Sequence, residues 1–282
     1  MSGAPYGSFQ KTVAIAHRTS LNEVARILGE RVACYNDPNA DTAAYNREYN
    51  CYIVDRTAGI ADAGSLAAWI NGSEAARSMR RLLKSFGMDA RKSELVKLSA
   101  LQEVLVTINP ATINWISCMT LPLTMPPPAL VNPATGATLS GEIAAIYCTL
   151  SAPGAVTVSG GYVAASKAMH CLFPELAPMI DGKHSGISYS NIVRETYTPP
   201  LDIVEWSGWL GAPIGGVPNP SPRGGGRKSW GWKQFMAAIG INQHIYESWQ
   251  AANGHPGLAA FLALDPSPGT TGIPRIIDKG LW

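Results

Sequence analysis

Apolar residues recur along most of this chain at the three- and four-residue spacing that is typical of amphipathic helices. Neither a run of hairpins nor a series of strand–helix–strand units interrupts that spacing. The predicted helices cover residues 21–35, 65–70, 74–86, 93–108, 141–150, 188–197, 202–210, 230–252 and 255–264. The sequence therefore predicts an all-α protein.

Three segments do not follow this pattern clearly. Three tyrosines give segment 42–54 a helical spacing, although its last residues would also suit a strand. Segment 122–133 is rich in proline, so it can be neither a helix nor a central strand, and we expect an ordered connector. Segment 155–159 is β-prone but isolated.

The composition predicts a globular protein. The chain has 282 residues, of which 46% are hydrophobic and 15% are charged. We expect one globular unit over 1–282, with tentative lobes at 20–150 and 151–282. The net charge of +2 is too small to indicate a nucleic-acid-binding protein by itself, so any basic surface must be local.

Targeting signals and ligand-spaced clusters are not visible in the sequence. Residues 1–6 carry no basic stretch followed by an apolar one, and no apolar run is long enough to span a bilayer. The five cysteines are far apart, form no CxxC pair and share no ligand spacing with the five histidines. We expect reduced core thiols in a cytoplasmic monomer that uses no metal or other cofactor and contacts no membrane.

Residues 160–181 carry the chemistry that the sequence suggests most strongly. Two glycines open the stretch, an apolar helix with Lys167 follows, Phe173-Pro174 breaks that helix, and Asp181 ends an apolar run. A lysine with apolar neighbours is expected to be partly buried, which lowers its pKa because the charged form loses hydration. Such an amine can attack a carbon centre and form a Schiff base. Asp181 can act as a base or stabilise a cation, or it can cap a helix.

The pattern of this stretch is Gly161-x4-Ser166-Lys167-x2-His170-x3-Pro174-x6-Asp181. It resembles the central motif of the helix-hairpin-helix base-excision DNA glycosylases, and most closely that of the bacterial 8-oxoguanine-glycosylase-like group. The closing segment 274–282 also resembles the end of such proteins. The resemblance implies a compact multi-helix fold with two helical lobes around a central cleft.

The resemblance assigns roles to individual residues. It makes Lys167 the amine that attacks the anomeric carbon of the sugar, and Asp181 the carboxylate that supports the oxocarbenium-like state. If Lys167 is only structural, Asp181 would activate a water molecule instead. The candidate DNA-binding residues of this stretch are Gly160, Gly161, Ser166 and His170. The two glycines could hold a phosphate through free backbone amides ahead of the helix N-terminus. A histidine that is satisfied within its own helix is an equally good interpretation of His170.

A glycosylase must flip a nucleotide out of double-stranded DNA, so it needs phosphate contacts and aromatic surfaces. Segment 223–233 offers glycines that let amides approach phosphate, together with cations and tryptophan rings. Its candidate DNA-binding residues are Arg223, Arg227, Lys228, Trp230 and Trp232. A surface loop that leads into a helix with two buried tryptophans is the alternative. The candidate base-pocket residues, each also a core candidate, are Tyr45, Tyr49 and Trp206.

A second basic row lies on the predicted helix 74–86. Its members are Arg77, Arg80, Arg81 and Lys84. We interpret it as a solvated helix face rather than as a phosphate-binding row.

Three hypotheses about function follow. The first is a DNA glycosylase for a damaged or modified base, with modified cytosines in phage DNA as one version that rests on analogy. The second is a non-catalytic helical DNA-binding module, and the third is a hydrolase of another class that uses Asp181. Placement of Lys167 and Asp181 around one cleft would separate the first hypothesis from the other two.

Overall fold

The computed structural model describes residues 20–89, 94–180, 185–196, 231–267, 269 and 271–281. Within these residues the chain forms twelve α-helices and one 3₁₀ helix, η1, and no strand, so the all-α prediction is confirmed. In chain order the helices are α2 (Leu21–Tyr35), α3 (Ala43–Ala63), α4 (Leu66–Ile70), α5 (Ser73–Ser85), α6 (Leu98–Thr107), α7 (Pro110–Ser117), η1 (Pro127–Ala129), α8 (Leu139–Ser151), α9 (Tyr162–Leu172), α10 (Ser185–Thr196), α12 (Trp232–Ala252), α13 (Leu258–Leu262) and α14 (Ile273–Leu281).

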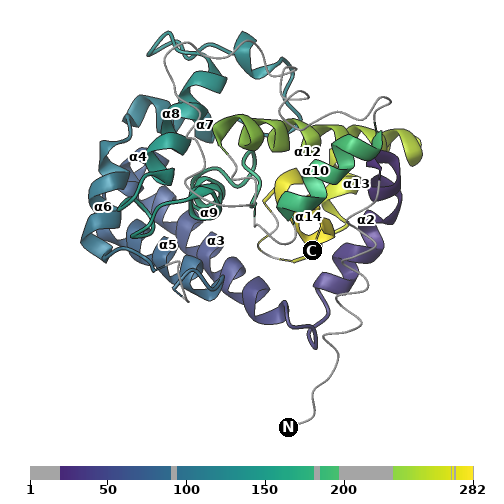
Figure 1. The fold of residues 1–282 in the computed structure, drawn as a ribbon, viewed down its shortest axis with the longest axis horizontal. Helices are drawn as coiled ribbons and strands as arrows, with labels where there is room; N and C mark the ends of the chain where they lie inside the picture. Colours follow the sequence, from purple (N-terminus) through teal and green to yellow (C-terminus); the bar gives the residue numbers. More distant parts are fainter. Residues whose placement is uncertain are drawn as a thin grey trace.

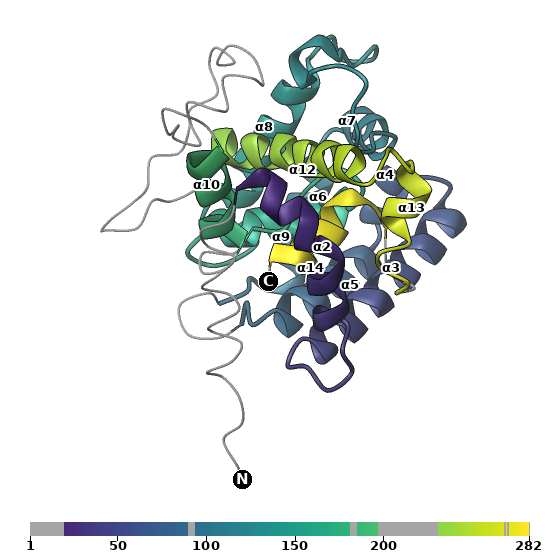
Figure 2. The ribbon, with the colours of Figure 1, turned by 90° about the vertical axis from the view of Figure 1, so that its right-hand side faces the viewer.

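The helices lie in two groups on either side of α9 (Figure 1). On one side α3 packs on α4 and α5, α4 packs on α7, and α5 packs on α6. On the other side α2 packs on α10, α12 and α14 (Figure 2). Helix α8 joins the groups, since it contacts both α9 and α12. Helix α2 therefore belongs spatially with helices of the second tentative lobe, although its sequence lies in the first.

Helix α9 is the centre of the fold. Every residue from Ala164 to Leu172 is buried, so this helix has no solvated face over most of its length. A helix that is buried on all sides is expected to be apolar throughout. Its three polar exceptions, Ser166, Lys167 and His170, therefore need partners inside the protein.

Two of the ambiguous segments are resolved by packing. Residues 43–63 form one long helix, α3, so the strand interpretation of its middle is wrong. Segment 155–159 is not isolated, because the Val96 N–H donates to the Val156 carbonyl at 3.1 Å and the Val158 N–H donates to the Glu94 carbonyl at 2.8 Å. This pairing keeps residues 94–96 extended, and α6 consequently begins at Leu98 instead of near residue 93.

Helices α7 and α14 are absent from the sequence-based prediction. The sequence does contain start signals for α7. The Asn109 side chain accepts from the Ala111 N–H, and Pro110 occupies the first helical position. Helix α14 carries Pro274 in its first turn and Gly280 near its end, which obscures its apolar spacing.

The cysteines are all free, as predicted, but three of them are not core residues. Cys34, Cys51 and Cys118 are exposed, whereas Cys171 is buried. No helix in the described part of the chain is both long enough and apolar enough to cross a bilayer.

Candidate active site around helix α9

The connection between α8 and α9 is a tight turn that ends at two glycines. Gly160 has a φ of +70°, and a Cβ atom on it would lie 2.6 Å from the Ser151 carbonyl oxygen. The Gly160 N–H donates to the Thr157 carbonyl and the Gly161 N–H donates to the Ser151 carbonyl. Both amides are thus used inside the turn, so their positions do not support the predicted phosphate contact.

The first turn of α9 follows these two glycines. No side chain of the described residues caps it, and a Cβ on Gly161 would meet none of their atoms within 4 Å. The first N–H groups of a helix have no intrahelical acceptor and carry the positive end of the helix dipole. Val158, three residues before this turn, has an exposed side chain.

Ser166 ties α9 to the chain that follows it. Its hydroxyl donates to the Ile180 carbonyl at 2.9 Å and accepts from the Ile180 N–H at 3.1 Å. The side chain is fully buried, so its position does not support the predicted contact with DNA. Ile180 directly precedes Asp181, which itself lies outside the described residues.

His170 makes a second tie, one helical turn further along. Its Nδ1 lies 2.6 Å from the Ala177 carbonyl oxygen, and its Nε2 lies 2.8 Å from the Tyr49 hydroxyl. Burial lowers the pKa of His170 to about 3, because a buried imidazolium loses its hydration. A neutral, fully buried histidine fits the interpretation of a satisfied internal side chain, and not that of a phosphate contact.

The returning segment is also held at its far side. The Ser185 hydroxyl, at the start of α10, donates to the Met179 carbonyl at 3.1 Å. The main chain of residues 177–180 is therefore bonded by side chains from α9 and α10. These bonds fix the residues on both sides of 181–184.

Helix α3 holds the C-terminal end of α9. The Tyr52 hydroxyl donates to the Cys171 carbonyl at 2.8 Å, and the Arg56 guanidinium donates to the Leu172 carbonyl at 2.9 Å. Carbonyls at a helix end lack intrahelical donors, so these side chains supply the missing partners. Tyr49, one turn earlier on α3, is fully buried and belongs to the same row, so its burial does not support its predicted place in a base pocket.

Lys167 lies beside aromatic side chains. Its Nζ is 3.4 Å from the Phe86 carbonyl oxygen and 5.0 Å from the centroid of the Phe86 ring. The Tyr45 ring packs near the Phe86 ring, with centroids 6.1 Å apart, and both rings are half-buried. Gly87, with a φ of +74°, ends the turn after α5 at this point. The structure thus places Phe86, which the sequence did not single out, against the amine, and Tyr45 beside Phe86.

The remaining predicted catalytic, base-pocket and DNA-binding residues are mostly not described. Asp181, Trp206, Arg223, Arg227, Lys228 and Trp230 lie outside the described residues. Trp232 is described, and it is a buried residue at the start of α12 with the Lys233 amine 5.8 Å from its ring centroid. Its burial agrees with the alternative of a core tryptophan.

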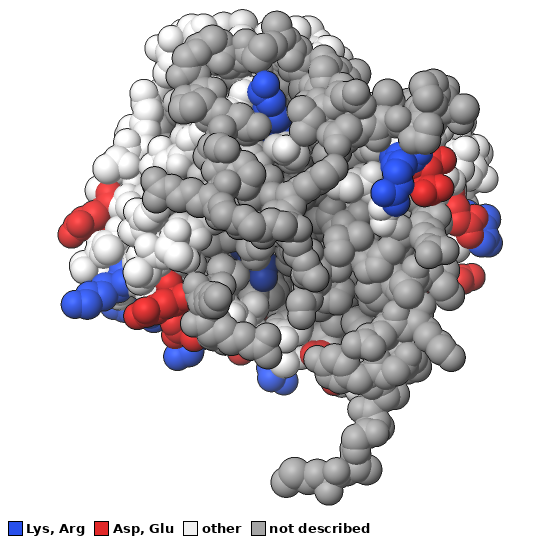
Figure 3. All heavy atoms as spheres, viewed as in Figure 1, with Lys and Arg blue, Asp and Glu red and all other residues white. Residues whose placement is uncertain are grey.

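The basic row on α5 is largely a solvated face, as predicted, and most of its cations are paired with acids. Arg77 pairs with Glu74, Arg81 pairs with Asp55 at 2.7 Å, and Lys84 pairs with Asp89 at 3.7 Å. On the face drawn in Figure 3, the described Lys and Arg side chains are scattered and most lie beside acidic ones. The described residues of that face therefore form no single basic patch.

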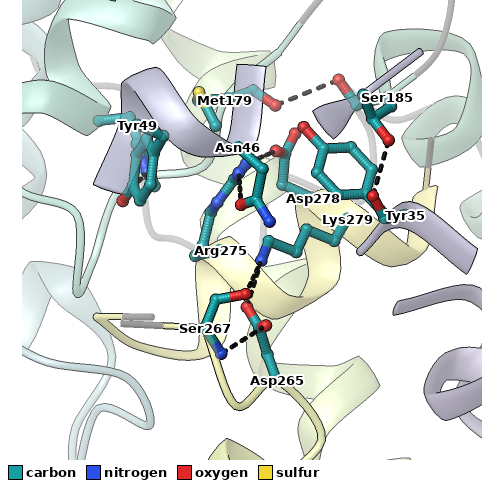
Figure 4. Close-up of polar contacts among 12 residues, drawn as sticks. Tyr35, Asn46, Tyr49, Met179, Ser185, Asp265, Ser267, Arg275, Asp278 and Lys279 are labelled. Atoms are coloured by element: carbon teal, nitrogen blue, oxygen red, sulfur yellow. Dashed lines mark hydrogen bonds and ion pairs between the residues drawn. The ribbon is translucent and has the colours of Figure 1, made fainter. Parts of the chain in front are cut away.

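The sequence analysis missed a buried charged cluster on α14 (Figure 4). Arg275 pairs with Asp278 at 2.8 Å, and Lys279 pairs with Asp265 at 2.6 Å, with all four side chains almost fully buried. The Arg275 guanidinium also lies 4.2 Å from the centroid of the Tyr49 ring. The pKa of Lys279 is lowered to about 8, first because burial disfavours its charge and then because Arg275 lies nearby. The sequence signal for this cluster was the presence of charged residues within an otherwise apolar C-terminal segment.

Comparisons with protein-family models, with curated protein sequences and with solved structures found no match. Among the described residues, no group of three His, Cys, Asp or Glu side chains could hold a metal ion. The candidate site is therefore defined by its own geometry: α9, the segment tied to it by Ser166 and His170, and the Lys167 amine beside Phe86 and Tyr45.

Proposed function

We propose that this protein is a DNA glycosylase, which flips a damaged or modified base out of double-stranded DNA and cleaves its N-glycosidic bond. Lys167 is the attacking amine and Asp181 is the carboxylate that stabilises the sugar cation. The observation that supports this best is the bond pair between Ser166 and Ile180. It holds the helix that carries Lys167 against the residue that precedes Asp181.

The proposed chemistry follows from these two groups. The Lys167 Nζ attacks C1′ of the sugar, the C1′–N bond breaks, and the base leaves with the bonding electron pair and takes up a proton. Loss of the amine proton and opening of the sugar ring give a Schiff base, from which β-elimination releases the 3′ phosphate. In a monofunctional version, water takes the place of the amine after Asp181 removes its proton.

The surroundings of Lys167 suit a nucleotide. The half-buried rings of Tyr45 and Phe86 offer apolar surface for a flipped base beside the amine. The first turn of α9, which no described side chain caps, offers partial positive charge for the DNA backbone. The two helix groups on either side of α9 support the two-lobe part of the proposal.

The test is release of a base from labelled duplexes that carry oxidised, alkylated or deaminated bases or bulky modified cytosines. Each duplex is incubated with and without borohydride, which reduces a Schiff base to a stable secondary amine. We expect base release from at least one duplex and a trapped adduct that is lost in Lys167→Ala. Lys84→Ala is the matched control, because it removes an amine near Phe86 that is exposed and already paired with Asp89.

Other outcomes would separate the hypotheses. Base release without any adduct, kept in Lys167→Ala and lost in Asp181→Asn, supports the monofunctional version. Duplex binding without release from any substrate would overturn the enzyme and support a non-catalytic DNA-binding module. Absence of both duplex binding and base release would contradict a role in DNA and favour a hydrolase of another class.

A further inference from the structure

We infer that the Tyr49 hydroxyl is a positioning group for the proposed excision site, and that it acts through His170 on the segment that leads to Asp181. This inference rests on the proposed function for its catalytic consequence. Its structural part concerns the described residues alone.

The direction of each hydrogen bond follows from counting protons. The Ala177 carbonyl can only accept, so the His170 Nδ1 must carry a hydrogen. Because the ring is neutral, Nε2 then has a lone pair and accepts from the Tyr49 hydroxyl. Tyr49 has one hydroxyl hydrogen, so at the 3.3 Å contact with Thr271 it is the Thr271 hydroxyl that donates. The order Thr271, Tyr49, His170, Ala177 is thus fixed by chemistry.

Tyr49 can hold this role because its own position is fixed. Its ring is fully buried under the Arg275 guanidinium, with 4.2 Å between the charge centre and the ring centroid. Burial raises the pKa of its hydroxyl, so the group stays a donor across the usual pH range. The imidazole of His170 is in turn held at both nitrogens, with no freedom to turn over.

The consequence lies in the returning segment. His170 and Ser166 stand one turn apart on α9 and bond the main chain at Ala177 and Ile180. Loss of the Tyr49 hydroxyl would leave His170 held at one nitrogen only. The hydrogen bond from His170 to the Ala177 carbonyl would then be looser. Residues 177–180 would then sample more positions. An excision step that depends on the carboxylate of Asp181, the next residue in the sequence, would slow.

Helix α3 supplies a matched control in Tyr52. Its hydroxyl is equally buried and makes a bond of the same length, 2.8 Å, to a main-chain carbonyl. That carbonyl belongs to Cys171 on α9 itself, and not to the returning segment. Tyr49→Phe and Tyr52→Phe therefore remove the same chemical group from the same helix, with different expected consequences.

The first experiment is amide hydrogen exchange of Ile180, whose N–H donates to Ser166. We expect Tyr49→Phe to speed this exchange by about fivefold to tenfold, which corresponds to one buried hydrogen bond. Tyr52→Phe should leave it within about twofold of the wild type. In a His170→Gln background, Tyr49→Phe should have no further effect, because the hydroxyl acts through His170. Thr271→Val is the second variant should Tyr49→Phe fold poorly, with a smaller change in the same direction.

The second experiment is single-turnover base release by the same variants. We expect Tyr49→Phe to lower the release rate about tenfold at unchanged DNA affinity, with Tyr52→Phe near the wild-type rate. Equal effects of the two variants on Ile180 exchange would overturn the inference. Absence of base release by the wild type would instead overturn the proposed function, while the exchange experiment would still decide the role of Tyr49.

Discussion

Gly160 is the residue at which the connection between α8 and α9 has no room for a side chain. Its positive φ alone would make a substitution strained, but Gly154 in the same turn has a similar φ of +81°. The two differ in space, because a Cβ on Gly154 would meet no atom within 4 Å, whereas one on Gly160 would press on main-chain atoms.

We expect Gly154→Ala to lower the free energy of unfolding by about 1–2 kcal/mol, the cost of a left-handed backbone in a residue with a Cβ. Gly160→Ala should cost at least about 2 kcal/mol more, because the neighbouring main chain must move. Urea denaturation of the two variants measures the difference. Equal costs would mean that the turn relaxes freely around Gly160.

His170 predicts how stability depends on pH. The unfolded chain takes up a proton on this residue below about pH 6.5, while the folded protein does so only near pH 3. Falling pH through that window therefore favours unfolding, by at most about 1.4 kcal/mol per pH unit. We expect His170→Gln to show a shallower loss of stability between pH 6.5 and 4 in urea titrations. Comparing the two slopes removes the contributions of other groups, such as Glu175, and parallel slopes would contradict the assignment.

At the scale of an element, α14 shows how a helix can be buried while it carries charge. Removing one partner of a buried ion pair leaves the other charge without compensation, which costs about 3–5 kcal/mol. Arg275 forms such a buried ion pair with Asp278, three residues further along α14. Arg77 also pairs with an acid three residues away, Glu74, but on the exposed surface of α5.

The prediction is that Arg275→Met lowers the free energy of unfolding by about 3–5 kcal/mol. Arg77→Met should lower it by no more than about 1 kcal/mol, because water already screens that pair. Chemical denaturation of both variants provides the measurement. A cost below about 1 kcal/mol for Arg275→Met would show that α14 does not depend on this cluster.

Local sequence signals predicted most of the helices but not the partners of their polar residues, and they left the long helix α3 ambiguous. The spacing of apolar residues marked α2 and α12, and the region of α9 was recognised from its glycines and its Phe173-Pro174 break. No local pattern shows that Ser166 bonds Ile180 or that His170 bonds Tyr49, because these partners come together only when the chain packs. A polar residue in an apolar helix predicts that a partner exists, and the fold decides which one.

At the scale of the whole molecule, the buried side chains form one continuous cluster that extends from α2 to α14. Shared core residues couple the two helix groups, with α8 and α9 lying between them. Sequence position suggested a boundary near residue 150, but α2 packs on α12 and α14 across it.

We therefore expect a single cooperative unfolding transition. Far-ultraviolet circular dichroism, which reports the helices, and tryptophan fluorescence should give the same urea midpoint. Two separate midpoints would show that the helix groups unfold independently.

The pairing of α2 with α14 also has a consequence during synthesis. Val24, Leu28 and Val32 emerge from the ribosome long before the helices that cover them. At about 5–20 residues per second, this apolar face waits on the order of tens of seconds for its partners. This face of α2 is thus covered only after α12 and α14 have been synthesised, and we expect it to be open to aggregation until then.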